Sequence, residues 1–106
     1  MQYHLVKFVT DERYECVQRL MRYNSGLSTD RINPLVGDLV LVYGDLELKV
    51  YMKVSERVWN LVNGVPDALV IKLVLPDMTN MGHYLSFWQY VESFENANTR
   101  TITKDH

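Results

Sequence analysis

The sequence predicts a single α+β domain, and two kinds of periodicity carry that prediction. Residues 46–54 alternate between apolar and polar side chains, which is the period of a strand with one buried face. Residues 82–95 instead place aromatic and aliphatic side chains at helical spacing. A chain of 106 residues, 47% apolar and 23% charged, has the size and composition of one globular domain. We therefore expect one core in residues 1–95, followed by a polar tail in residues 96–106.

The first two elements are a strand and a helix. Residues 2–9 carry apolar side chains on both alternating faces, which predicts a strand that is covered on both sides. Thr10 is a suitable N-cap, and Asp11 and Glu12 add negative charge where a first helical turn favours it. The helix that follows has a narrow apolar stripe, made by Cys16, Val17, Leu20 and Met21.

A loop and a hairpin come next. Residues 25–37 have no period and are rich in turn formers, so they predict a long loop. The apolar run 39–42 and the alternating run 46–54 then predict two antiparallel strands joined at Gly44 and Asp45.

The segment after the hairpin allows two interpretations. In the first, Ser55 caps a short helix over residues 56–63, Pro66 and Asp67 form a turn, and residues 68–75 are a central strand. In the second, Val58 to Leu75 form another hairpin. The two interpretations differ on whether Trp59 lies in a helix or in a strand.

These elements define two candidate topologies. The first interpretation gives a mainly antiparallel sheet of about four strands in β-α-β-β-α-β order, a ferredoxin-like arrangement with an added C-terminal helix. The second gives an SH3-like half barrel that packs on two helices. The sequence itself leaves the choice open.

Composition narrows the function classes. A formal charge of −2 provides no strong field for capturing nucleic acid. The single cysteine, Cys16, favours a reducing compartment, and the sequence leads us to expect neither a signal peptide nor a membrane-spanning segment. We expect a cytoplasmic protein that does not enter a membrane.

The sequence contains no recognised catalytic or metal-binding motif. Paired ligands at zinc spacing, phosphate-binding loops and nucleophile motifs are all missing. We therefore predict no catalytic residue, no metal and no cofactor, which makes an enzyme the less favoured class. A small-molecule pocket made by Asp30, Arg31 and Asn33 in the long loop is the enzymatic alternative.

The favoured hypothesis is a small protein-binding module. The last helix has more aromatic residues than one buried stripe needs, and exposed apolar groups of this kind mark protein interfaces. The module would dock on another protein or on its own copy, as a phage-type accessory inhibitor or adaptor does. The predicted interface consists of Met78, Met81, Tyr84, Leu85, Trp88 and Tyr90.

The alternative partner is single-stranded nucleic acid. An aromatic side chain between two cations on the polar face of a strand could stack a base and neutralise phosphates. Arginines on the first helix would add positive charge. The predicted residues are Lys49, Tyr51, Lys53, Arg19 and Arg22.

Overall fold

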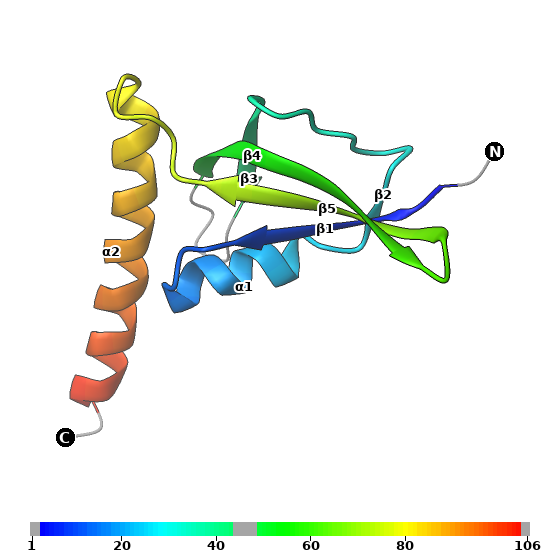
Figure 1. Cartoon of the computed structure of the whole chain (residues 1–106). Coiled ribbons are helices and arrows are strands. Elements are labelled where there is room, and N and C mark those ends of the chain that lie inside the picture. The colour runs from blue at the N-terminus through cyan, green and yellow to red at the C-terminus, as the bar shows by residue number, and fades with distance from the viewer. Residues whose placement is uncertain (1–2, 44–48, 105–106) are drawn as a thin grey trace.

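The computed structural model describes residues 3–43 and 49–104, which form one mixed sheet and two helices (Figure 1). The sheet order is β2-β1-β5-β4-β3. Only β1 and β5 run parallel, and the other neighbouring pairs are antiparallel. The elements are β1 (Leu5–Thr10), α1 (Glu15–Tyr23), β2 (Leu27–Ser28), β3 (Leu39–Tyr43), β4 (Lys49–Val62), β5 (Val65–Val74) and α2 (Met81–Lys104).

The α1 helix packs on one face of the sheet through the stripe expected from the sequence. Its four stripe residues are all at most 3% exposed. The helix begins at Glu15 rather than directly after Thr10. The Thr10 hydroxyl instead accepts a hydrogen bond from the Glu12 amide at 3.2 Å, which forms a local turn before the helix.

The α2 helix stands at the end of the sheet where β5 finishes (Figure 1), and it contacts β4 and α1. It runs to Lys104, so residues 96–104 continue the helix where a loose tail was expected. No glycine or proline follows Gly82, and the sequence therefore has no strong helix terminator in this region. No helix among the described residues has the length and apolar character to cross a membrane.

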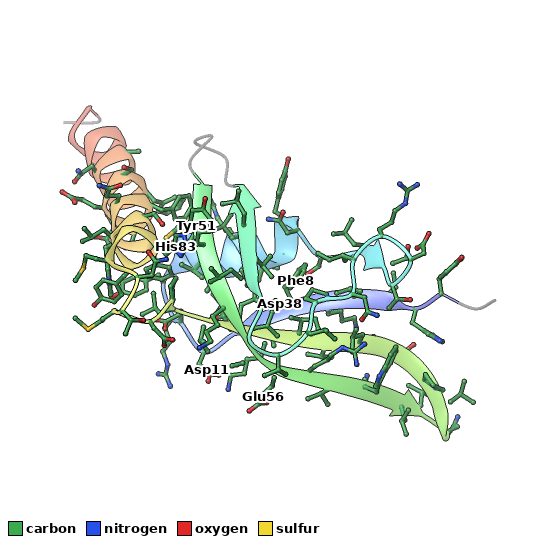
Figure 2. The ribbon with its side chains drawn as sticks, turned by 90° about the horizontal axis from the view of Figure 1, so that it is seen from above. Phe8, Asp11, Asp38, Tyr51, Glu56 and His83 are labelled. Carbon is green, nitrogen blue, oxygen red and sulfur yellow. The ribbon has the colours of Figure 1, made fainter. Side chains whose placement is uncertain are left out.

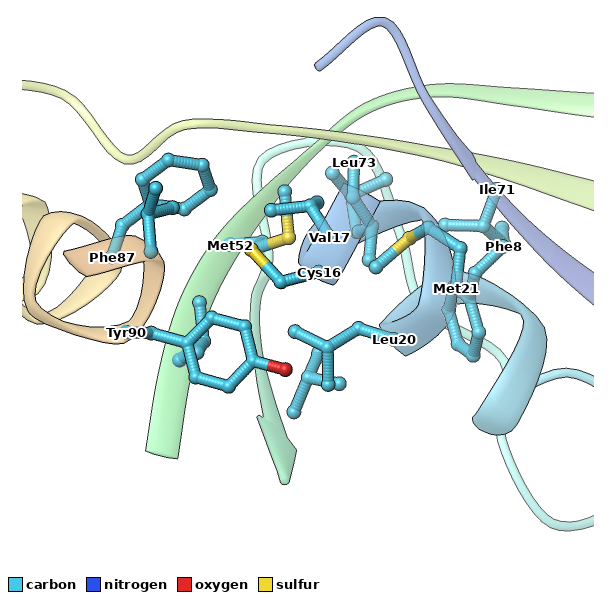
Figure 3. Close-up of a cluster of buried hydrophobic side chains, with 14 of the residues drawn as sticks. Phe8, Cys16, Val17, Leu20, Met21, Met52, Ile71, Leu73, Phe87 and Tyr90 are labelled. Carbon is cyan, nitrogen blue, oxygen red and sulfur yellow. The ribbon is translucent and has the colours of Figure 1, made fainter. Parts of the chain in front are cut away.

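The core lies between the sheet, α1 and α2 (Figure 3). Alternate residues of the central strands supply its sheet side, as the two-residue period of a strand requires. Phe87 and Met52 are its largest fully buried side chains. Cys16 is one of its smaller members and is 2% exposed.

The ferredoxin-like arrangement is not found, because residues 56–62 belong to a strand and not to a helix. Within the described residues, β4 and β5 form a long hairpin. The second interpretation of the sequence predicted a hairpin here, over Val58 to Leu75. The turn is at Asn63 and Gly64, and Pro66 and Asp67 do not form it. The predicted turn at residues 44–45 lies outside the described residues.

Candidate functional site

The first turns of α2 retain part of the interface predicted from the sequence. Met81 and Leu85 lie one helical turn apart and are about half exposed, and Met78 is more exposed still. Tyr84 and Trp88 are only partly exposed, and their rings contact each other at 6.3 Å between centroids. An exposed apolar patch of three side chains therefore remains at this end of the helix.

Tyr90, which was predicted to belong to that interface, lies in the core. Its ring is 3% exposed and lies beside Leu20 of α1 (Figure 3). Phe87, Tyr90 and Val91 share one side of α2 because residues three and four positions apart lie on the same side of a helix. Tyr90 therefore does not belong to the exposed apolar patch at the start of α2.

Residues of the 77–83 segment occupy the polar face of the strand that was considered for nucleic acid. The His83 ring stacks on the Tyr51 ring with centroids 4.0 Å apart (Figure 2). The Lys53 ammonium donates to the Asp77 carboxylate at 2.9 Å. The stacking surface and one cation of the predicted site are thus already engaged, while the side chain of Lys49 lies outside the described residues.

The two arginines of the same prediction lie on α1. Arg19 is 3.8 Å from the carboxylate of Glu15 and 5.5 Å from the ring centre of Phe94. With Arg22 it lines an open cavity of about 350 Å³, which Leu20, Tyr23 and Tyr90 complete. None of the contacts among the described residues joins these arginines to Tyr51 or Lys53, so the predicted cationic platform is not assembled.

Chemistry based on Cys16 or on a metal has no geometric support in the described part of the chain. Burial raises the pKa of the Cys16 thiol, which disfavours the reactive thiolate. No three His, Cys, Asp or Glu side chains of the described residues are grouped as metal ligands would be. His4 contacts Trp59, and His83 contacts Tyr51, so each imidazole packs against another aromatic ring.

The long loop forms an open groove along the edge strand β3. The groove has a volume of about 440 Å³ and is lined by residues 31–34, Asp38 and residues 39–41. Asp38 accepts a hydrogen bond from the Leu35 amide at 2.8 Å, and Asn33 accepts one from Arg57 at 2.5 Å. The side chains of Asp38 and Asn33 are thus used to hold the loop in place. They are not available as a set of polar groups that point toward a bound small molecule.

The distal part of the β4–β5 hairpin is the surface that sequence reasoning missed. We call residues 58–67 the arm. It projects past the end of α1 (Figure 1), and its part from residue 61 onward pairs with no third strand of the described chain. Five of its apolar side chains are 40–60% exposed: Val58, Trp59, Leu61, Val62 and Val65.

The turn of the arm is encoded by one dipeptide. Asn63 and Gly64 both have positive φ, at 52° and 78°, as the two central residues of a type I′ hairpin turn require. An Asn-Gly pair between two β-rich segments is a strong short-range signal for such a turn. This signal in the sequence could have located the arm.

The base of the arm is fixed by contacts with the long loop and with His4, the residue before β1. The Arg57 guanidinium lies 5.7 Å from the ring centre of Trp59 and donates to the Asn33 side chain. On the same face, the His4 ring meets the Trp59 ring edge-on, with centroids 5.5 Å apart. Trp59 is therefore held in one place while 40% of it stays exposed.

The opposite face of the three central strands is uncovered next to the arm. We call it the open face, and its residues alternate with those that face α1. Leu5, Val9 and Val58 are 41–50% exposed there, so no described helix or loop packs over them. Across β1, β5 and β4 the face has three rows: Leu5-Ala68-Asn60, Lys7-Val70-Val58 and Val9-Lys72-Glu56.

Charges on the open face balance. The Lys72 ammonium lies 2.5 Å from the Asp11 carboxylate, and this hydrogen bond, with the nearby charge of Glu56, raises the pKa of Lys72. Asp11 and Glu56 lie near each other on this side, away from the His83–Tyr51 stack (Figure 2). Lys7 has no ion pair among the described residues, nor has Glu56.

The described residues thus define a small α+β domain with a mixed sheet, a projecting apolar arm and an open sheet face. Comparisons with protein-family models, with curated proteins and with solved structures find no match to this chain. The function must therefore be argued from the geometry of these surfaces.

Proposed function

We propose that this protein is a non-enzymatic protein-binding module that docks through the arm. The observation that carries the proposal is the exposure of five apolar side chains within residues 58–65. Single exposed apolar residues are ordinary, but a contiguous group on a projecting element marks an interaction surface. The α2 patch predicted from the sequence is smaller, so the arm is the preferred docking element.

The charge of the arm favours a protein as the partner. Residues 58–67 contain one charged side chain, Asp67, and no lysine or arginine. Nucleic-acid binding needs cations that neutralise phosphates, and binding to anionic lipid surfaces also depends on basic residues. An apolar surface of a protein is the partner class that this composition fits.

The geometry of the arm suits tight docking. The Asn63-Gly64 turn and the ladder between β4 and β5 fix its backbone before any partner arrives, so little conformational entropy is lost on binding. Trp59 is a rigid aromatic side chain of the type that dominates binding energy at protein interfaces. Its contacts with His4 and Arg57 orient the ring in advance.

Photo-crosslinking in an extract of the source cells tests the proposal. Benzoylphenylalanine replaces Leu61 in the arm or, as the control, Tyr23 on α1; these side chains are 57% and 74% exposed. We expect a discrete crosslinked protein with the Leu61 variant only, and its loss when Val65→Asp is added to that variant. Equal labelling from both positions, or labelling that survives Val65→Asp, would overturn the proposal.

A further inference from the structure

We propose that the groove along β3 is a second binding site, which takes an extended segment of another protein as an added strand of the sheet. The segment would lie between β3 and the loop of residues 31–34, in the open groove of about 440 Å³. This inference does not depend on the docking role of the arm, because it rests on the backbone of β3 and on no residue of the arm.

The β3 strand is a sheet edge without the usual protection. Among the described residues it pairs only with β4. Edge strands of soluble proteins usually carry a lysine, a proline or a bulge that discourages a further strand from pairing. None of these devices lies within β3, whose sequence is Leu-Val-Leu-Val-Tyr and whose register with β4 has no shift. A regular, uncharged edge of this kind can accept another strand.

One hydrogen bond fixes which backbone groups of this edge face outward. The Val54 amide donates to the Asp38 carbonyl at 2.9 Å. Bonded and non-bonded pairs alternate along an antiparallel ladder, so Val40 is the next residue of β3 that bonds to β4. The amides and carbonyls of Leu39 and Leu41 therefore point away from β4. No hydrogen bond among the described residues engages these four groups.

The second wall of the groove limits the size of the occupant. Residues 31–34 form this wall, and the hydrogen bond between Asn33 and Arg57 holds them away from β3. The space between the two walls has room for one extended chain, whereas the edge of a second folded copy would bring its neighbouring strands with it. Since β3 spans roughly 17 Å, about five residues of the segment would pair with it. A strand added in this way is a recurring mode of peptide recognition.

The side chains beside the edge indicate an apolar segment. Side chains of a strand point alternately to the two faces of its sheet. Those of the segment would therefore meet Leu39 and Leu41 on one face, and Ile32 and Val40, which pack partly into the core, on the other. Leu39 is 49% exposed and gains cover from such a neighbour. We expect β-branched or aromatic residues at alternate positions and no proline in the paired stretch.

Selection from a library of displayed random heptapeptides, with the natural chain as the target, tests the inference. We expect enriched peptides with the pattern of an apolar strand, and protection of the Leu39 and Leu41 amides from hydrogen exchange when such a peptide binds. Leu41→Pro removes an outward amide but no bond of the ladder, so it should weaken binding at least about tenfold. Leu41→Val keeps that amide and is the matched control, which should bind the peptide nearly as the natural chain does.

The outcomes separate this site from the arm. Failure to enrich any peptide, or equal binding by Leu41→Pro and Leu41→Val, overturns the inference. Peptides that lose binding with Val65→Asp would belong to the arm and would also overturn it, whereas the crosslink at position 61 tests the arm by itself. A natural chain that forms a dimer in light scattering and becomes monomeric with Leu41→Pro would assign the edge to a second copy instead.

Circular dichroism shows whether Leu41→Pro keeps the fold. If it does not, the decision rests on hydrogen exchange of the natural chain with the enriched peptide. Protection of the Leu39 and Leu41 amides then supports the added strand, and unchanged exchange at both positions refutes it.

Discussion

The imidazole of His83 lies flat on the ring of Tyr51, with 4.0 Å between ring centroids and 25° between ring planes. His83 is in the first turn of α2 and Tyr51 is on β4, so the stack joins the C-terminal helix to the sheet. Next to the stack, Lys53 of β4 forms an ion pair with Asp77, which lies between β5 and α2. The stack and the ion pair together cover the part of this sheet face that lies next to α2. The rest of the same face is the open face.

The His83–Tyr51 stack should contribute measurably to stability. In a double-mutant cycle with Tyr51→Ala and His83→Ala, we expect a coupling of about 0.5–1.5 kcal/mol in the free energy of unfolding. Urea denaturation measures it. The control cycle pairs Tyr51→Ala with Leu85→Ala, which is exposed and should be additive. Additivity of the first pair would show that the rings touch without stabilising the fold.

The turn of the arm should depend on the glycine at position 64. Gly64 has φ +78°, so Gly64→Ala should destabilise the protein by about 1–2 kcal/mol, the cost of a left-handed conformation for a residue with Cβ. Gly82→Ala is the matched control, because this glycine is in α2 and an added Cβ meets only Asn80 Oδ1, at 3.7 Å. It should be neutral or stabilising. Equal losses for both variants in urea denaturation would contradict the turn assignment.

Much of the fold could be predicted from local sequence patterns. The strands at 5–10, 39–43 and 68–74, the apolar stripe of α1 and the start of α2 follow from period and turn chemistry. Residues 56–62 could not be assigned from periodicity, because Ser55 is an extra residue of β4 between the pairs Val54–Leu73 and Glu56–Lys72. This bulge changes which face the next side chain of β4 takes. The second register shift, after Asn60, adds its extra residue to β5 instead. Val58, Leu61 and Val62 then show the spacing of a buried helix stripe.

The candidate site was harder to predict than the fold. The apolar character of residues 58–65 is plain in the sequence, but whether it is buried depends on which elements cover the hairpin, which is a tertiary property. The same holds for Tyr51, since nothing local indicates that His83 stacks on it. The interface on α2 was predicted because this helix has more aromatic residues than one buried stripe needs. Tyr90 is not part of it, because α1 packs against the side of α2 that carries Tyr90.

Cys16 should be chemically inert in the folded protein. It is 2% exposed, and burial raises its thiol pKa, so both access and thiolate fraction are low. We expect iodoacetamide to modify it at least about a hundredfold more slowly in buffer than in denaturing urea. Mass spectrometry follows the reaction. Equal rates in the two conditions would place the thiol at the surface.

The pair of Lys72 and Asp11 should lose its effect at high pH. The pKa of Lys72 is raised above its usual 10.5, chiefly by the hydrogen bond to Asp11. Because the folded pKa is the higher one, the pair stabilises the protein fully below pH 10.5 and loses that contribution as the pH rises through the folded pKa. The difference in unfolding free energy between the natural chain and Asp11→Asn should therefore be present at pH 8 and shrink at strongly alkaline pH. A difference that stays constant with pH would mean that Asp11 acts through something other than Lys72.

The apolar side chains of the arm should contribute little to the free energy of unfolding. Leu73 is fully buried in the core, and Leu73→Ala should cost about 2–5 kcal/mol, because it removes buried methyl groups and leaves a cavity. Leu61 is 57% exposed in the arm, and Leu61→Ala should change the stability of the monomer by less than about 0.5 kcal/mol. Both values come from urea denaturation at a concentration where light scattering shows only monomer, so that any contribution from a dimer is absent.

A loss of several kcal/mol for Leu61→Ala would mean that the arm packs as part of the core, and its apolar surface would then need no partner to explain it. A negligible loss is the result expected of an exposed side chain, and it is what the proposed docking role of the arm requires.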